Sequence, residues 1–262
     1  MKRSGACVAC WLLLTTGCAS LKAPLVLLPS FPPSIAWPEG GPVRSIVVDA
    51  GHGGHDPGAM YHGLQEKDLN LDISRRLKTQ LQASGLSVTM TRDSDDFIPL
   101  SRRPGVANRM VADLFLSVHI NANRNRHVAG IEVYYPRESV VDSEDAFPPR
   151  VGPGEVALPT ATVQRILWDL VLSRTRRQSA RMGLQICRAM RSRLGVRCRG
   201  VHGARFVVLR EAKMPAVLVE VGYLSNRPEA SRLANPQYRQ AIAQAITEGV
   251  LAYVRGLGVQ HI

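Results

Sequence analysis

The chain has 262 residues, a length that fits one sizeable domain with short additions, and its hydrophobic content of 45% is ordinary for a globular core. Its charge is unusual, because 33 Lys and Arg residues against 21 Asp and Glu residues leave a formal net charge of +12. This balance predicts attraction to polyanions such as nucleic acid, anionic lipid or an anionic cell-wall polymer. Three of the five cysteines lie in the first 18 residues, and the two that remain make no disulfide framework and lack the paired spacing of a structural zinc site.

The first 17 residues have the pattern of a bacterial signal peptide. Lys2 and Arg3 precede an apolar run that is too short to span a membrane as a mature helix. The run ends in LLLTTGCAS, where Gly17 comes directly before Cys18. This stretch resembles the lipobox of bacterial lipoproteins, except that Thr15 stands where Leu is usual. We therefore expect an exported protein of the cell envelope, in the periplasm and anchored to a membrane through lipidated Cys18, with plain export as the alternative.

Residues 18–42 form a predicted tether ahead of the folded domain. Six prolines between positions 19 and 42 rule out a regular helix and favour an extended chain. We expect the folded domain to occupy residues 43–262. Because the signal peptide directs the chain out of the cytoplasm, a nucleic-acid partner is not expected in spite of the positive charge.

Strands and helices alternate in the folded domain. Short runs of apolar and β-branched residues predict six strands. These strands are 44–50, 86–92, 114–120, 130–136, 205–210 and 216–226. Apolar residues that recur every four positions predict helices, the first over 66–85 and the last over 236–258. The alternation predicts an α/β fold, with a single twisted, mostly parallel sheet of about six strands and helices on both faces.

The arginine-rich run at 174–199 has two interpretations. Met182, Ile186, Met190 and Leu194 keep a four-residue spacing, which favours an amphipathic helix with a solvated basic face. The alternative is a patch that attracts a polyanion.

The folded domain contains two of the five cysteines, Cys187 and Cys198. A single disulfide bridge between them and a pair of buried free thiols are both compatible with the sequence.

The stretch VVDAGHGGHDPGA, residues 47–59, places two histidines among four glycines at the end of the first predicted strand. Glycine at this density costs backbone entropy, so it indicates a turn or a close approach. A dinucleotide-binding loop is excluded, because Asp56 occupies the third glycine position of the G-x-G-x-x-G pattern. Two alternatives remain: a tight turn in which His52 is an ordinary polar residue, or a site in which His52 binds a metal ion.

Three further residues could join His52 at one edge of the sheet. Glu66 begins the first predicted helix, while His119 and Glu220 end the third and the sixth predicted strands. The functional crevice of an open α/β sheet lies beyond the carboxyl ends of its strands. Two imidazoles and a carboxylate are typical ligands of a catalytic zinc ion, and a further carboxylate is the usual general base. The alternatives are hydrogen-bonded turn histidines and a Glu66 that only stabilises the start of its helix.

The blocks DAGHGGHDPGA, EKDLNL, TRDSDDFIPLSRRPGVAN, ADLFLSVHINAN, GIEVYY and FVVLREAKMPAVLVEVGYLSN occur in this order. Together they resemble, over roughly residues 44–254, the zinc-dependent N-acetylmuramoyl-L-alanine amidases of bacterial cell-wall hydrolysis. The resemblance implies that His52, Glu66 and His119 bind zinc and that Glu220 is the catalytic acid/base. Four other histidines match no ligand position and are expected in loops or on the surface; these are His55, His62, His127 and His202.

The resemblance also implies a reaction. The enzyme would be a peptidoglycan hydrolase in which a zinc-activated water cleaves the amide between N-acetylmuramic acid and L-alanine of the stem peptide. Another zinc-dependent cell-wall peptidase and a non-catalytic peptidoglycan-binding protein are the alternatives. From residue size alone, we further infer that the glycines after the first strand leave room for a bulky glycan–peptide substrate.

One acidic, proline-containing segment, 137–173, interrupts the alternation of strands and helices. Some members of the resembled family carry an insert at this point that covers the zinc with a carboxylate. We therefore expect 137–173 to be a regulatory lid that an activator protein displaces; a solvated acidic loop is the alternative. The carboxylates available for this role are Glu138, Asp142, Glu144, Asp145 and Glu155.

Overall fold

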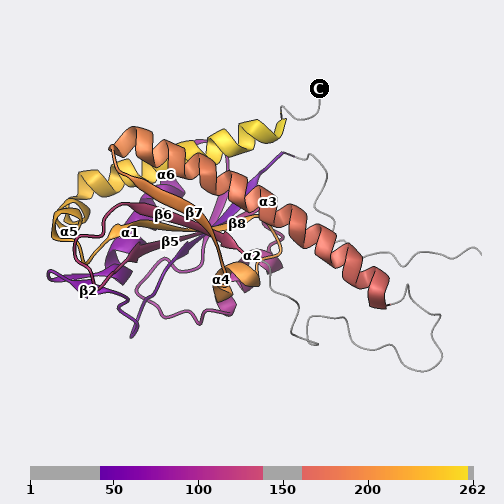
Figure 1. Cartoon of the computed structure of the whole chain (residues 1–262), viewed down its shortest axis with the longest axis horizontal. Helices are drawn as coiled ribbons and strands as arrows, with labels where there is room; N and C mark the ends of the chain where they lie inside the picture. Colours follow the sequence, from indigo (N-terminus) through magenta and orange to yellow (C-terminus); the bar gives the residue numbers. More distant parts are fainter. Residues whose placement is uncertain (1–41, 138–160, 259–262) are drawn as a thin grey trace, which may run out of the picture. The chain divides into compact units, whose positions relative to one another are not determined.

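A six-stranded sheet forms the centre of the fold in a computed structural model that describes residues 42–137 and 161–258. Its strands are β1 (Ser45–Ala50), β4 (Ser87–Met90), β5 (Leu114–Asn121), β6 (Ile131–Pro136), β7 (Cys198–Ala204) and β8 (Ala216–Tyr223). They lie in the order β4-β1-β5-β8-β6-β7. Figure 1 shows strands β5, β6, β7 and β8 with helices α3 (Ala161–Leu194) and α6 (Pro236–Gly258) running across them. All neighbouring strands run parallel except β6 and β8, which are antiparallel. The predicted mostly parallel α/β sheet is confirmed.

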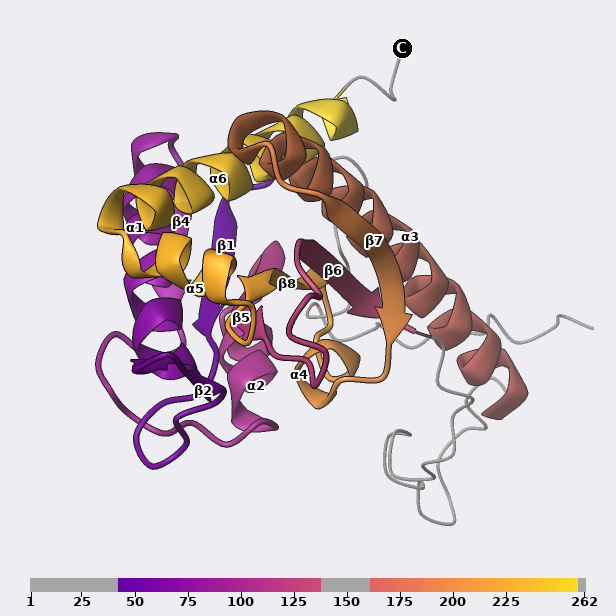
Figure 2. The ribbon, with the colours of Figure 1, turned by 60° about the vertical axis from the view of Figure 1, so that its left-hand side comes forward.

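The two faces of the sheet are covered unequally (Figure 2). On one face lie the three long helices, α1 (Glu66–Ala83), α3 and α6, which enclose the larger hydrophobic core. On the other face lie two short helices, α2 (Arg102–Arg109) and α4 (Val207–Arg210), around a smaller core. Strand residues alternate between the cores, with Val48 in the larger and Val47 in the smaller. The thinly covered face has room for polar side chains.

A two-stranded hairpin leads into the first long helix. Strands β2 (Met60–Tyr61) and β3 (Leu64–Gln65) pair antiparallel across a two-residue turn. Both turn residues, His62 and Gly63, have positive φ angles, as the tight hairpin turn that matches strand twist requires. The hairpin therefore ends directly at Glu66, the first residue of α1.

The predicted strand at 205–210 is wrong, because this stretch contains helix α4 and the missing strand, β7, precedes it at Cys198–Ala204. Helix α3 ends at Leu194, followed by Gly195 with φ 65°, a common way to terminate a helix. Strand β7 lies at the sheet edge and none of its residues is fully buried, so it lacks the apolar pattern that identifies a strand. The amphipathic interpretation of α3 is confirmed by the burial of Met182, Ile186 and Met190.

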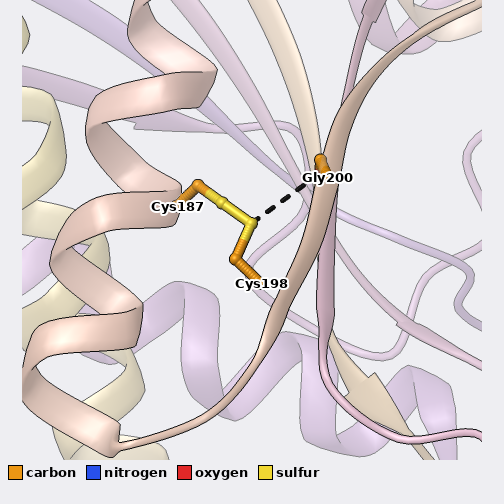
Figure 3. The surroundings of a disulfide bond; sticks show 3 residues. All are labelled: Cys187, Cys198 and Gly200. Atoms are coloured by element: carbon orange, nitrogen blue, oxygen red, sulfur yellow. Dashed lines mark hydrogen bonds between the residues drawn. A yellow bond between two sulfur atoms is a disulfide. The ribbon is translucent and has the colours of Figure 1, made fainter.

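Cys187 of α3 and Cys198 of β7 form a disulfide, with their Cα atoms 5.9 Å apart (Figure 3). Of the two alternatives that the sequence left open, the bridge is therefore correct for the folded domain. It joins the last turns of α3 to the first residue of the edge strand.

Several predictions fall on parts of the chain outside the described residues. The signal peptide 1–17, most of the tether and residues 138–160 of the predicted lid belong to this group. Residues 161–173 of the same predicted lid form the first part of α3. Within the described ranges, none of the helices combines the length and the apolar character needed to cross a bilayer.

Replacing Cys187 and Cys198 together by Ser should lower the free energy of unfolding by about 3 kcal/mol, because the bridge closes a chain segment with a sequence separation of 11. Urea denaturation followed by circular dichroism measures this difference. Dithiothreitol should destabilise the wild type to the same extent and leave the double variant unchanged. Equal urea midpoints for the two oxidised proteins would contradict a stabilising role for the bridge.

Candidate metal centre

The three predicted ligands lie at the edge where parallel strands end. His52 follows β1 by two residues, His119 lies near the end of β5, and Glu66 is the first residue of α1. Strands β1, β5 and β8 are parallel neighbours, so their carboxyl ends meet at this edge. Glu220 of β8 is in register with His119 of β5. The fold thus brings together all four residues that the sequence analysis selected.

The cluster is compact around one carboxylate oxygen. Glu66 Oε1 lies 3.2 Å from His52 Nε2 and 3.0 Å from His119 Nδ1. One ligand atom from each residue lies within 4.8 Å of the other two. The two imidazole rings meet edge to face, with their centroids 5.0 Å apart. Two ring nitrogens and an oxygen at these separations can converge on a single metal ion.

Glu66 is buried, with 4% of its surface exposed, and both of its carboxylate oxygens accept hydrogen bonds. Oε1 accepts the backbone N–H of Ile120 and the amide of Asn70, and Oε2 accepts the backbone N–H of Ala59. Burial opposes ionisation, but hydrogen bonds from His119 and His52 outweigh it and hold the pKa of Glu66 far below its usual value. The cluster therefore contains a permanently charged carboxylate.

Asp56 orients the first histidine. Its Oδ2 lies 2.7 Å from His52 Nδ1, on the side of the ring away from the cluster. This contact leaves Nε2 facing Glu66, and a carboxylate behind a histidine is the usual partner of a metal ligand. Burial lowers the pKa of His52, but its contacts with Glu66 and Asp56 more than offset this and raise it. The sequence analysis missed this role of Asp56, although the four-residue spacing from His52 carries the signal.

Two glycines of the first loop, Gly51 and Gly58, make room for the cluster itself. The other two, Gly53 and Gly54, lie against Asp96 and Phe97. Protein atoms therefore fill the space beside all four glycines, and the inference that they accommodate substrate was wrong. A Cβ at Gly51 would overlap the imidazole of His119. A Cβ at Gly58 would lie 2.6 Å from Glu66 Oε2 and 2.7 Å from His52 Cδ2. Gly58 also has φ 64°, a conformation that favours glycine. The side chains of the candidate ligands occupy the space that these two glycines leave.

Two arginines bind the backbone that presents His52. Arg92 donates to the carbonyls of Ala50 and Gly51 at 3.0 and 2.9 Å. Arg103 donates to the carbonyls of Ala50 and His52 at 2.7 and 3.0 Å. His52 itself has φ 60°, an unusual left-handed conformation for a residue with a side chain. These hydrogen bonds hold it in that strained conformation.

Asp49 forms a buried ion pair with Arg103. Its Oδ1 lies 3.0 Å from Arg103 Nη1, and both side chains are almost fully buried. The remaining capacity of the carboxylate is used by the hydroxyls of Thr91 and Ser117. A buried ion pair needs these additional hydrogen bonds to offset the free energy lost when its charges leave water. Asp49, Arg92 and Arg103 all lie in blocks that carry the family resemblance, but the sequence pattern gives none of them an individual role.

Glu220 differs from the other carboxylates of this region. Its Oε2 is buried and has no hydrogen-bond partner among the described residues, although the residue as a whole is partly accessible. Burial, together with the negative charges of Glu66 and Glu132, raises the pKa of Glu220 well above its ordinary value. A carboxyl group with this environment retains its proton more readily and can exchange it with a bound molecule.

The remaining histidines take no part in the cluster. His55, His62, His127 and His202 are all exposed, which confirms the expectation that they lie in loops or on the surface. His202 is on strand β7 rather than in a loop.

Gly51→Ala should reduce metal binding, because the new methyl group would displace the His119 ring. We expect the affinity for zinc to fall at least about tenfold while the fold persists, as misorientation of a ligand typically does. Zinc content after equilibrium dialysis, measured by mass spectrometry, tests this. Gly256→Ala is the matched control, since a Cβ at Gly256 meets nothing within 4 Å. Wild-type zinc affinity in Gly51→Ala would contradict the assignment of His119.

Comparisons with known proteins identify the family of the chain. The profile of the N-acetylmuramoyl-L-alanine amidase family matches residues 46–252. The chain is 36% identical over 212 residues to the amidase LytC of Bacillus subtilis, covering 81% of this chain but only 36% of that protein. It is 35% identical over 222 residues to the amidase AmiA of Escherichia coli, covering 81% of this chain and 77% of that protein.

Solved structures give the same result. The amidase AmiC2 of Nostoc punctiforme is 32% identical with a TM-score of 0.63, and the comparison covers 81% of this chain and 97% of that one. An N-acetylmuramoyl-L-alanine amidase from Clostridium difficile 630 is 28% identical with a TM-score of 0.65, covering 82% and 98%. The chain therefore belongs to the N-acetylmuramoyl-L-alanine amidase family.

Proposed function

We propose that the protein hydrolyses peptidoglycan at the amide bond between N-acetylmuramic acid and L-alanine, with a zinc ion held by His52, Glu66 and His119. One observation carries this proposal: the three side chains converge beside Glu220, whose buried oxygen has no partner among the described residues. Family membership supports the bond that is cleaved.

The chemistry of the donors fits zinc. Two imidazole nitrogens and one carboxylate are a common set in catalytic zinc sites, and three protein ligands leave a coordination position for water. Asp56 behind His52 completes the usual arrangement of a ligand and its supporting carboxylate. A zinc ion bound there would lower the pKa of its water and polarise the scissile carbonyl.

Glu220 moves the proton. Its carboxylate would accept a proton from the attacking water and deliver that proton to the nitrogen of L-alanine as the C–N bond breaks. The raised pKa suits the second half of this transfer, because a carboxyl group that binds its proton more tightly keeps it until the leaving amine accepts it. Because Oε2 has no hydrogen-bond partner among the described residues, no other protein group there competes for the proton.

Charge and location are consistent with this substrate. Peptidoglycan carries many stem-peptide carboxylates, and a formal net charge of +12 favours association with it. We further propose that the protein acts in the cell envelope after export, in the periplasm. Lipidation of Cys18 and displacement of a 137–173 lid by an activator protein remain predictions from the sequence.

Removal of the metal should abolish hydrolysis. We expect purified peptidoglycan to yield free-ended L-alanyl stem peptides and intact glycan strands, identified by mass spectrometry of the products. Dialysis against EDTA should stop product release, and added zinc should restore it, because water is poorly nucleophilic at neutral pH without a metal. Cuts between stem-peptide residues would instead support another cell-wall peptidase, and undiminished activity in EDTA would exclude a metal enzyme.

Glu220→Gln should lower kcat by at least about a hundredfold while zinc binding survives, since an amide cannot accept the proton. The rate of release of soluble muropeptides and the zinc content of the same sample measure the two properties separately. Glu211→Gln, which changes a carboxylate with a side chain 37% exposed, is the matched control. A Glu220→Gln protein that lacks zinc, or one that keeps most of its activity, would show that the role is misassigned.

A further inference from the structure

A β-bulge in the edge strand β7 interrupts the strand pairing at Arg199. Strands β6 and β7 pair Ile131 with Cys198 and then Glu132 with Gly200, so Arg199 is an extra residue without a partner in the ladder. Bulges of this kind redirect a side chain and are common next to active sites. The bulge, rather than the regular alternation of strand residues, therefore sets the direction of the Arg199 side chain.

The neighbours of Arg199 hold the bulge in place. Cys198, the residue before it, is bonded to Cys187 of α3, and Gly200 follows it (Figure 3). Gly130, with φ 112°, lies under its side chain: a Cβ there would be 3.2 Å from Arg199 Cγ and 2.5 Å from the Arg197 carbonyl oxygen. The arginine thus extends over a gap that only glycine leaves open.

The side chain of Arg199 extends toward the candidate catalytic carboxylate. Its Nε donates to Glu132 Oε1 at 3.1 Å. Glu132 is in register with Glu220, and Glu220 is in register with His119, so three adjacent strands carry these residues in one row. Residues directly opposite in neighbouring strands have Cβ atoms about 5 Å apart. The guanidinium is therefore separated from Glu220 by a single side chain.

Glu132 alone does not account for this arginine. The carboxylate is 9% exposed and already accepts the hydroxyl of Tyr134 at 2.8 Å and the amide of Asn121 at 3.2 Å. The Arg199 side chain is 33% exposed, and it has a side-chain hydrogen bond with Tyr223 besides the Nε contact with Glu132. A guanidinium has five N–H groups, so these two contacts leave donors available. The guanidinium also lies 5.9 Å from the Tyr223 ring centroid. One edge of the guanidinium is fixed while the side chain still reaches solvent.

We propose that Arg199 is a specificity-determining residue that binds a free carboxylate of the stem peptide, and that Glu132 is the residue that positions it. This inference rests on the proposed amidase function. A guanidinium recognises a carboxylate through paired N–H groups, and a held guanidinium loses less entropy on binding.

Distance selects the carboxylate. The guanidinium contacts Glu132, which lies one strand spacing of about 5 Å from Glu220, and an extended peptide advances about 3.4 Å per residue. With L-alanine at the scissile bond, the guanidinium lies within reach of the residue that follows L-alanine.

The experiment uses two synthetic muramoyl peptides that differ only at the residue after L-alanine, which carries either a free carboxylate or the corresponding carboxamide. The zinc-loaded full chain should prefer the carboxylate by about tenfold or more in kcat/KM, the usual effect of a hydrogen bond to a charged group. Arg199→Gln should lose this preference by slowing only the carboxylate substrate. Arg199→Lys, which keeps the charge but not the paired geometry, should retain part of it.

Arg197→Gln is the matched control, because it removes an exposed arginine two residues away and should leave the preference unchanged. Equal rates of the wild type on both peptides would overturn the inference. So would an Arg199→Gln variant that is slowed equally on both, since that is the pattern of a purely structural residue. If the wild type cleaves neither peptide at the muramoyl–alanine bond, the proposed function fails instead. The selectivity of the wild type and of Arg199→Lys decides the matter even if Arg199→Gln does not fold.

Discussion

The backbone of the candidate metal centre depends on one buried ion pair, between Asp49 and Arg103. Both side chains are almost inaccessible, and neither charge could remain in the core without the other. Because the guanidinium also binds the carbonyls of Ala50 and His52, the charge pair fixes the direction in which the chain leaves β1. His52 can then hold a left-handed conformation that an unsupported loop would abandon. The position of His52, the first candidate ligand, thus depends on the Asp49–Arg103 ion pair in the smaller core.

The rest of the site comes from strands that run in opposite directions. His119 and Glu220 lie near the carboxyl ends of the parallel strands β5 and β8. Glu132 and Arg199 lie near the amino ends of β6 and β7, which reach the same edge because β6 is antiparallel to β8. The reversal places a fixed carboxylate and a guanidinium beside Glu220 that a fully parallel sheet would have carried to the far edge. The single change of strand direction therefore places the Glu132–Arg199 pair next to the candidate metal centre.

These observations separate what a sequence can reveal from what it cannot. The four residues His52, Glu66, His119 and Glu220 were found because each ends or begins an element with a clear apolar pattern. Strand β7 was missed because a partly exposed edge strand needs no such pattern, while the apolar run at 205–210 fits a short buried helix equally well.

Other features depend on neighbours distant in the chain. The purpose of Gly51 becomes visible only when the His119 ring is seen to fill the space beside it. The proximity of Arg199 to Glu220 depends on a strand register and a bulge, neither of which leaves a periodic trace in the sequence.

The reversal of β6 has a further consequence for any segment that would cover the site. Strand β6 carries the chain away from the cluster, and its later residue Tyr134 pairs with Leu218, on the amino-terminal side of Glu220. A lid that begins after Pro136 must therefore travel back along β6 to the level of Glu132, four residues or about 13 Å, before its first carboxylate can reach the cluster. Chain length thus becomes a requirement for regulation: a connection too short to make this return could join the same elements but could not shield the site.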